Sequence, residues 1–202
     1  YTTLFRSLNR TLFLAINASV HSSTEMRLLT TFLAQWLITG VPLLLIGLWL
    51  RGTRHHRAAA VTATLSIVFA LGCNLLISSL WFHPRPFMQG LGQNFLEHAP
   101  ESSFPSDHAT VMFTLAVALM LASLRKLGVL ILLLGTLVGW ARVYLGVHFP
   151  LDIVGSLLVS LISAWLVPLV LSWQHLGERL LYVFEHLYQR VFPSAAQRDT
   201  HQ

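Results

Sequence analysis

Charged residues are scarce in this sequence. Only 10% of its 202 residues are Asp, Glu, Lys or Arg, whereas an ordinary soluble domain has roughly 25%. Hydrophobic residues make up 54% of the chain and the mean hydropathy is +0.64. A soluble domain of this length needs far more polar surface, so the composition excludes a soluble enzyme, a disordered chain and a coiled coil. It predicts an integral membrane protein.

Cysteine and lysine are almost absent. Cys73 is the single cysteine, which excludes a disulfide framework within the chain. Lys126 is the single lysine, and arginines supply the rest of the 13 basic residues. They do not form a basic run with interleaved aromatics, so nucleic acid is not expected as a partner. We interpret the arginines as juxtamembrane residues that face anionic membrane lipids.

Long uncharged runs divide the chain. Three runs hold 22 to 25 residues without Asp, Glu, Lys or Arg, and about 20 residues suffice to cross a hydrocarbon core of roughly 30 Å. Two shorter runs reach span length if His108 and Arg142 lie at the membrane rim. The five predicted spans are residues 28–50, 58–82, 109–124, 127–141 and 153–174.

Both ends of the chain carry an amphipathic pattern. Residues 4–20 place apolar side chains at helical spacing with arginines opposite, and residues 180–192 repeat this pattern. We interpret both as interfacial helices on the bilayer, with a short sixth span over 4–20 as the alternative. The predicted fold is all-α: a polytopic membrane helical bundle of about five transmembrane helices, in one domain over 1–202 with its core at about 28–174.

Basic residues predict the orientation. Eight lie in the first linker, the third linker and the C-terminal tail: Arg51, Arg54, Arg57, Arg125, Lys126, Arg179, Arg190 and Arg198. Five lie on the opposite side: Arg6, Arg10, Arg27, Arg85 and Arg142. Because loops rich in Lys and Arg stay in the cytoplasm, we expect a cytoplasmic C-terminus and outward-facing second and fourth linkers.

Three polar clusters lie on the outward side: His83-Pro84-Arg85-Pro86, Phe104-Pro105-Ser106-Asp107-His108, and the stretch from Arg142 to Asp152. The second cluster has the proline, serine and aspartate of a helix start, and the N–H groups of a helix N-terminus bind anions. Two spans separate the second linker from the fourth. All three clusters are therefore expected at one face of the membrane.

The residue types in these clusters suit phosphoryl chemistry. Arg85 and Arg142 can bind phosphate oxygens in pairs through planar guanidinium groups. His148 precedes Asp152 by four residues. At this spacing a carboxylate can hold one imidazole nitrogen and leave the other free to attack.

Two other kinds of site are less well supported. His108, His148 and Asp152 could supply three metal ligands, but two convergent arginines would repel a cation. A transporter or channel usually needs a charged residue in the middle of a span, and the predicted spans have none there. We therefore expect neither a metal nor another cofactor.

The motifs make the sequence similar to a known family. The residues Arg85-Pro86, Pro105-Ser106-Asp107-His108 and Arg142-x3-Gly146-x-His148-x3-Asp152 resemble the three signature motifs of the type-2 phosphatidic acid phosphatase superfamily. Within it, Gly92-Gln93-Asn94-Phe95-Leu96 and Ser103-Phe104-Pro105-Ser106-Asp107-His108 resemble the bacterial undecaprenyl-diphosphate phosphatase branch.

This resemblance implies a role for each motif residue. His148 would attack the terminal phosphorus and form a phosphohistidine, with Asp152 orienting the imidazole. His108 would protonate the leaving oxygen and then activate water. The phosphate oxygens would be held by Arg85, Arg142, Ser106 and the backbone N–H groups around Asp107.

The sequence departs from the superfamily pattern at three positions. Ser78 stands where a lysine is usual, Asp107 where a glycine is usual, and Ala141 where a serine is usual. The missing lysine removes one phosphate-binding cation and suits a diphosphate head group rather than a monoester. Because the carboxylate of Asp107 would repel an anion, we expect it to turn away or to cap the helix.

The resemblance implies a metal-independent enzyme of the bacterial inner membrane. It would convert undecaprenyl diphosphate to undecaprenyl phosphate at the outer face, which recycles the lipid carrier for cell-wall synthesis. Two alternatives stay open: a phosphotransferase that passes the phosphoryl group to another lipid such as lipid A, and a broader phosphatidate or phosphatidylglycerophosphate phosphatase.

Overall fold

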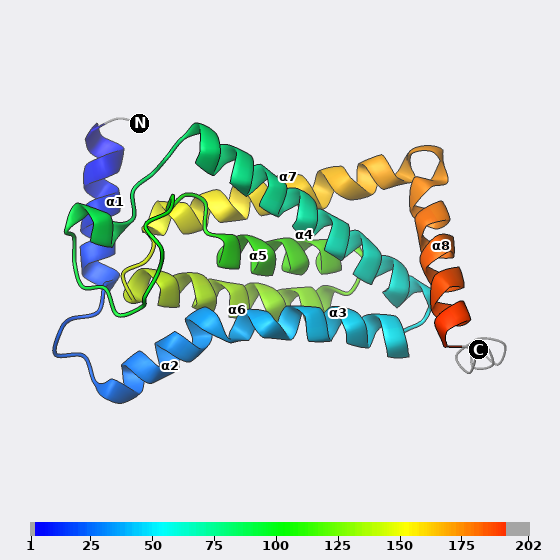
Figure 1. Cartoon of the computed structure of the whole chain (residues 1–202), viewed down its shortest axis with the longest axis horizontal. Helices are drawn as coiled ribbons and strands as arrows, with labels where there is room; N and C mark the ends of the chain where they lie inside the picture. Colours follow the sequence, from blue (N-terminus) through cyan, green and yellow to red (C-terminus); the bar gives the residue numbers. More distant parts are fainter. Residues whose placement is uncertain (1–2, 193–202) are drawn as a thin grey trace.

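Helices α2 to α7 run along the long axis of the molecule, and α1 and α8 lie across its two ends (Figure 1). The computed structural model describes residues 3–192, and in this part of the chain every regular element is a helix. The α-helices are α1 Thr3–Ile16, α2 Thr24–Gln35, α3 Gly40–Arg51, α4 Arg54–Leu80, α5 Asp107–Leu121, α6 Arg125–Tyr144, α7 Pro150–Ser172 and α8 Leu176–Val191. Short 3-10 turns are η1 Leu37–Thr39, η2 Pro86–Gln89 and η3 Trp173–His175.

Four segments of the described chain are long and apolar enough to cross a membrane: Thr24–Leu50, Arg54–Leu80, Arg125–Tyr144 and Pro150–Ser172. The first joins α2, η1 and α3 and corresponds to the predicted span at 28–50. The remaining predicted span, residues 109–124, corresponds to α5, whose 15 residues fall short of the ~20 needed for a crossing on its own. The all-helical membrane bundle is confirmed, and the count of five spans is approximate.

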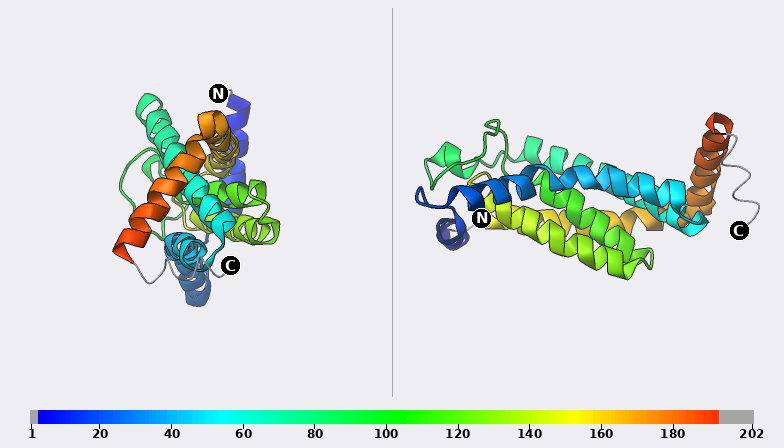
Figure 2. Two further views of the ribbon diagram at one scale, coloured as in Figure 1. Left: turned by 90° about the vertical axis from the view of Figure 1, so that its right-hand side faces the viewer. Right: turned by 90° about the horizontal axis from the view of Figure 1, so that it is seen from below.

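Helix α5 is the centre of the bundle. Every residue from Ala109 to Leu119 is buried, and the helix packs against α4, α6 and α7. A helix that is apolar on all sides needs neighbours on all sides, which explains why this segment shows no polar stripe in the sequence. Both views in Figure 2 show α5 and α6 side by side.

Small polar side chains join α5 to α7. Thr114 donates to the hydroxyl of Ser160 at 3.0 Å, and Ser160 donates to the carbonyl of Thr110 at 3.0 Å. Side chains of this size allow two helices to approach closely, and their hydroxyls satisfy each other where no water is present. This packing holds the first half of α5 against the middle of α7.

The N-terminal helix α1 is attached to the bundle end that holds the predicted polar clusters. Asn9 accepts a hydrogen bond from the N–H of Leu151 at 3.0 Å, and the rings of Phe13 and Phe149 meet edge to face at 5.3 Å. Asn9 and Phe13 are buried, whereas the leucines on the other side of α1 are exposed. This amphipathic helix therefore covers one end of the bundle.

Helix α8 covers the opposite end. Its Glu185 lies 3.6 Å from Arg57 and 4.0 Å from Arg54, both in the first turn of α4. Arg57 is buried and also donates to the carbonyl of Trp49 at 3.2 Å. The predicted amphipathic segment 180–192 is part of this helix. Arg198, which contributes to the predicted orientation, lies outside the described residues.

Candidate active site

Two loops build the candidate site at the α1 end of the bundle. Residues 81–106 join α4 to α5 and residues 145–149 join α6 to α7. The N–H of Phe95 donates to the carbonyl of Leu145 at 2.9 Å and joins the two loops. Within the longer loop, the N–H of Ser103 donates to the carbonyl of His83 at 2.6 Å. An isolated bridge between Pro84 and Ser102 closes the longer loop on itself.

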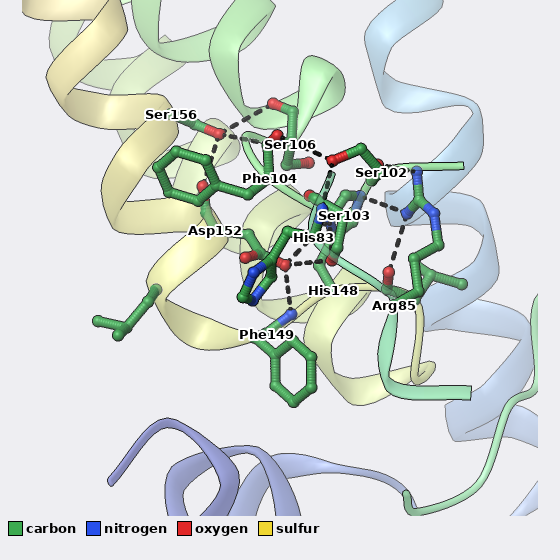
Figure 3. A network of polar contacts seen from close by, with 12 residues as sticks. His83, Arg85, Ser102, Ser103, Phe104, Ser106, His148, Phe149, Asp152 and Ser156 are labelled. Atoms are coloured by element: carbon green, nitrogen blue, oxygen red, sulfur yellow. Dashed lines mark hydrogen bonds and ion pairs between the residues drawn. The ribbon is translucent and has the colours of Figure 1, made fainter. Parts of the chain in front are cut away.

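A cleft of about 730 Å³ opens between these loops and the face of α4. Five of the seven predicted site residues line it: Arg85, Asp107, His108, Arg142 and His148. The other two lie directly behind its wall. Ser106 precedes α5, and Asp152 lies in the first turn of α7 beneath the imidazole of His148. The structure therefore gathers residues that are up to 67 positions apart in the sequence (Figure 3).

The ring nitrogens of His148 have different partners. Nδ1 lies 2.8 Å from the carbonyl oxygen of Ser103, which can only accept, so Nδ1 carries the proton. Nε2 therefore has a lone pair, which accepts a hydrogen bond from Nη1 of Arg85 at 3.1 Å. Burial and the charges of Arg142 and Arg85 hold the pKa of His148 well below its usual range. The imidazole is thus neutral at neutral pH, with its nucleophilic lone pair on the Arg85 side.

Asp152 acts on this histidine less directly than the spacing predicts. Its Oδ2 lies 3.5 Å from Nδ1 of His148, while it accepts hydrogen bonds from the hydroxyl of Ser103 and from the N–H of Phe149, the latter at 2.7 Å. The bond to Phe149 caps the start of α7. Ser103 thus contacts both residues, through its carbonyl to His148 and through its hydroxyl to Asp152.

Arginine and serine groups around His148 leave buried donors available. Arg85 donates to the carbonyls of Val147 at 2.9 Å and Ser102 at 3.2 Å, and Arg142 donates to Ala34 at 3.3 Å. Three of their donor groups are buried without a hydrogen-bond partner in the described part of the chain: Nε of Arg85, Nε of Arg142 and the hydroxyl of Ser106. Buried donors normally have acceptors, and an oxyanion in the cleft would provide them.

Asp107 does not cap α5. Its Oδ1 accepts a hydrogen bond from Nδ2 of Asn74 at 2.8 Å, and the same amide lies 3.0 Å from the hydroxyl of Thr110. Asn74 is buried in α4, so it fixes the carboxylate at the wall of the cleft. Ser78, where the family pattern has a lysine, also lines the cleft but donates to Leu75 of its own helix at 3.0 Å.

Three residues that shape the site had no role predicted from the sequence: Asn74, Ser103 and Gly146. Asn74 carries a detectable signal, because an amide in an otherwise apolar span needs a partner. Gly146 has φ +89°, and a Cβ atom there would collide with the carbonyl oxygen of Gln93. Ser103 belongs to a motif quoted above, but its role is not readable from the sequence, because it depends on contacts with residues 45 and 49 positions away.

The remaining histidines divide between two places. His98 lines the cleft with its ring centroid 6.4 Å from that of His148, and burial together with Arg85 lowers its pKa. His83 lies on the other side of the loop, facing α1. No group of three His, Cys, Asp or Glu residues in the described chain is arranged to hold a metal ion.

Comparison with known proteins decides the family. A family model described as the PAP2 superfamily matches residues 59–176, which include all three motifs. The chain belongs to the PAP2 superfamily. Like other members of this phosphatase family it is a membrane hydrolase, and the matched segment runs from α4 through α7, the helices that carry the site.

Relatives extend this similarity over most of the chain. The protein YbjG of Escherichia coli (strain K12) is 38% identical over 189 residues, 94% of either chain. Undecaprenyl-diphosphatase BcrC of Bacillus subtilis (strain 168) is 31% identical over 159 residues, 79% of this chain and 82% of BcrC. The crystal structure of Aquifex aeolicus LpxE superposes with a TM-score of 0.66 and 26% identity, over 79% of this chain and 94% of LpxE.

Proposed function

We propose that this PAP2 protein removes the terminal phosphate of undecaprenyl diphosphate through a phosphohistidine intermediate. The observation that carries the proposal is the neutral His148, whose Nε2 lone pair faces a cleft lined by Arg85 and Arg142. Each arginine has a buried Nε–H without a partner among the described residues. The relative BcrC is named as an undecaprenyl-diphosphatase. A lipid substrate also fits a cleft whose lining continues onto the apolar residues Leu71 and Leu75 of α4.

In the proposed first step, Nε2 of His148 forms a bond to the terminal phosphorus. The bond from that phosphorus to the bridging oxygen breaks, and undecaprenyl phosphate leaves. Arg85 and Arg142 neutralise the charge on the transferring oxygens, and positioning with electrostatic stabilisation supplies most of the rate enhancement. Arg85 must exchange its hydrogen bond from Nε2 to a phosphate oxygen as the substrate enters.

In the proposed second step, water attacks the phosphohistidine and inorganic phosphate leaves. His108 lines the same cleft and is the candidate acid for the first step and base for the second. A lipid monophosphate leaves more easily than an alkoxide, because its second pKa is roughly 6, as for phosphoamino acids. Loss of His108 is therefore expected to be less harmful with a diphosphate than with a monoester.

The proposed orientation places the cleft on the outer face of the bacterial inner membrane and the C-terminus in the cytoplasm. The basic residues at the α8 end, among them Arg54, Arg57 and Arg125, support this orientation. The diphosphate head group would then be presented from the outer leaflet, beside the end of α4. No metal enters this mechanism, since two arginines provide the positive charge.

The direct test is release of phosphate from undecaprenyl diphosphate by purified protein in detergent with EDTA. Wild type is expected to be active, and His148→Ala inactive. His55→Ala is the matched control, because His55 is an exposed histidine at the opposite end of the bundle, bonded to Ala122. Equal phosphate release by wild type and His148→Ala would refute the role of His148 as the nucleophile.

Labelling the terminal phosphate with ³²P separates the steps. In His108→Ala we expect an acid-labile label on the protein to accumulate, because attack by water is slowed more than transfer to His148. Label that moves to a second lipid instead of to free phosphate would identify a phosphotransferase. An inactive wild-type protein that is folded would point to a different lipid phosphate as the substrate.

A further inference from the structure

A second, separate pocket lies between α1 and the end of α4. Its volume is about 240 Å³, and its polar lining comes from Arg6, Asn9 and Arg10 of α1 with His83 and Gln89 of the 81–106 loop. Trp81, Phe82, Pro84 and Phe149 complete the wall. Arg85 lines the catalytic cleft and its neighbour Pro84 lines this pocket, while Phe82 contributes to the walls of both spaces.

The pocket is positively charged. Arg6 and Arg10 are four positions apart and therefore lie on the same face of α1. Arg10 donates to Oε1 of Gln89 at 2.9 Å, which holds its guanidinium group at the pocket wall. Burial and the nearby charge of Arg6 lower the pKa of His83. None of the described residues that line the pocket carries a carboxylate.

The pocket also lies where lipid head groups are expected. Leu4, Phe5 and Leu8 of α1 are 73%, 52% and 48% exposed, although the opposite side of this helix is buried on the bundle. An amphipathic helix with this pattern lies at the boundary between head groups and acyl chains. Trp81 is half exposed at the end of the membrane-spanning helix α4, a typical interfacial position for tryptophan.

From these observations we infer that the α1 pocket binds the phosphate of an anionic phospholipid head group. Two guanidinium groups on one helical face provide paired donors for phosphate oxygens. The volume is below the roughly 300–1,000 Å³ of pockets that enclose drug-sized molecules. It therefore admits a head-group phosphate, while the acyl chains stay outside along the apolar face of α1.

A phosphate bound in this pocket would restrict the movement of the 81–106 loop. The carbonyl of His83 accepts the N–H of Ser103 at 2.6 Å, and the hydroxyl of Ser102 accepts the N–H of His83 at 3.1 Å. Ser103 in turn holds His148 and Asp152. A phosphate between α1 and this segment would tighten a loop that carries part of the active site.

The test is a binding measurement that does not depend on activity. Purified protein in neutral detergent is titrated with dioctanoyl phosphatidylglycerol, dioctanoyl phosphatidylcholine or inorganic phosphate, and the melting temperature is followed. A ligand that binds only the folded state raises this temperature in a saturable way. We expect a rise of several degrees with phosphatidylglycerol and a much smaller one with phosphatidylcholine. An equal rise with inorganic phosphate would assign the pocket to the free anion and overturn the lipid assignment.

Variants locate the effect. Arg6→Gln/Arg10→Gln is expected to raise the half-saturating phosphatidylglycerol concentration roughly tenfold or more, because two charge-assisted contacts are lost. Arg125→Gln/Arg179→Gln removes the same charge at the opposite end and should bind like wild type. If both double variants bind like wild type, or both are weakened equally, the α1 pocket is not the site.

One variant keeps both arginines in case their loss prevents folding. Gln89→Glu places a carboxylate beside Arg10, where it should pair with the guanidinium group and exclude the phosphate. Loss of the phosphatidylglycerol response in Gln89→Glu supports the inference, and an unchanged response contradicts it. Because none of these residues lines the catalytic cleft, failure of this test leaves the proposed phosphatase activity untouched.

Discussion

Replacing Ser103 with alanine removes one hydroxyl from behind the active site. Its backbone carbonyl stays and still accepts the Nδ1 proton of His148, so the tautomer of the imidazole is kept. The change deletes the hydrogen bond from the hydroxyl to Oδ2 of Asp152, a carboxyl group that is 1% exposed. Asp152 then keeps the N–H of Phe149 as its partner.

A hydrogen bond to a charged group contributes about 1.5–3 kcal/mol. If that stabilisation is needed mainly when His148 becomes positively charged in the transition state, kcat falls by about 10- to 150-fold, since each ~1.4 kcal/mol is a factor of ten. KM should change little, because Ser103 does not line the cleft. Initial rates over a range of substrate concentrations separate the two parameters.

The combination with Asp152→Asn tests the reasoning more strictly. If Ser103 acts through Asp152, adding Ser103→Ala to Asp152→Asn should reduce kcat by less than threefold, whereas independent roles would give the full product. Ser102→Ala is the matched control, as its hydroxyl contacts the N–H of His83 and not Asp152. A KM increase with unchanged kcat in Ser103→Ala would refute the positioning role.

Four further predictions concern pH and stability. Because burial and two neighbouring arginines lower the pKa of His148, the acid limb of kcat/KM should lie below pH 6.5. Unfolding returns this imidazole to its usual pKa of about 6.5, so below that pH the unfolded chain binds a proton that the folded chain does not. The free energy of unfolding, measured by chemical denaturation, should therefore fall as the pH drops below that value. Gly146→Ala should greatly lower the yield of folded protein, because positive φ combines with a backbone collision. Gly90→Ala, at φ +63° with open space around it, should lose only about 1–2 kcal/mol. Asn17→Ala removes hydrogen bonds to Gln93 and to the carbonyl of Tyr144 and should lower the melting temperature by several degrees, while Ser7→Ala, which affects an exposed bond within α1, should not.

The sequence predicts the helical membrane bundle well because its signals are long and local. Uncharged runs mark α4 and α7, and the two shorter runs correspond to α5 and α6. The break at η1, Leu37–Thr39, is not visible in hydropathy, since all three residues fit an apolar run. The shortness of α5 is explained by its central place, where other helices cover it on all sides.

The candidate site is partly readable from the sequence. Motif spacing and the even number of intervening spans predict that Arg85, His108 and His148 share one cleft, and the structure places them there. The four-residue spacing of His148 and Asp152 predicts a direct pair, but in the structure Ser103 contacts both residues. Its position depends on how the 81–106 loop folds back, a long-range arrangement that no local pattern encodes.

The hydrogen bond between Arg85 and Nε2 of His148 affects which kinds of substrate can react with this histidine. In the resting state the attacking lone pair is occupied, and it becomes available only when an incoming group offers Arg85 a better acceptor. A phosphate carries several strongly negative oxygens and can do so, whereas the carbonyl of an ester or amide is neutral. For the proposed mechanism, selectivity against acyl substrates is therefore set before any bond is made, by the charge needed to release the nucleophile.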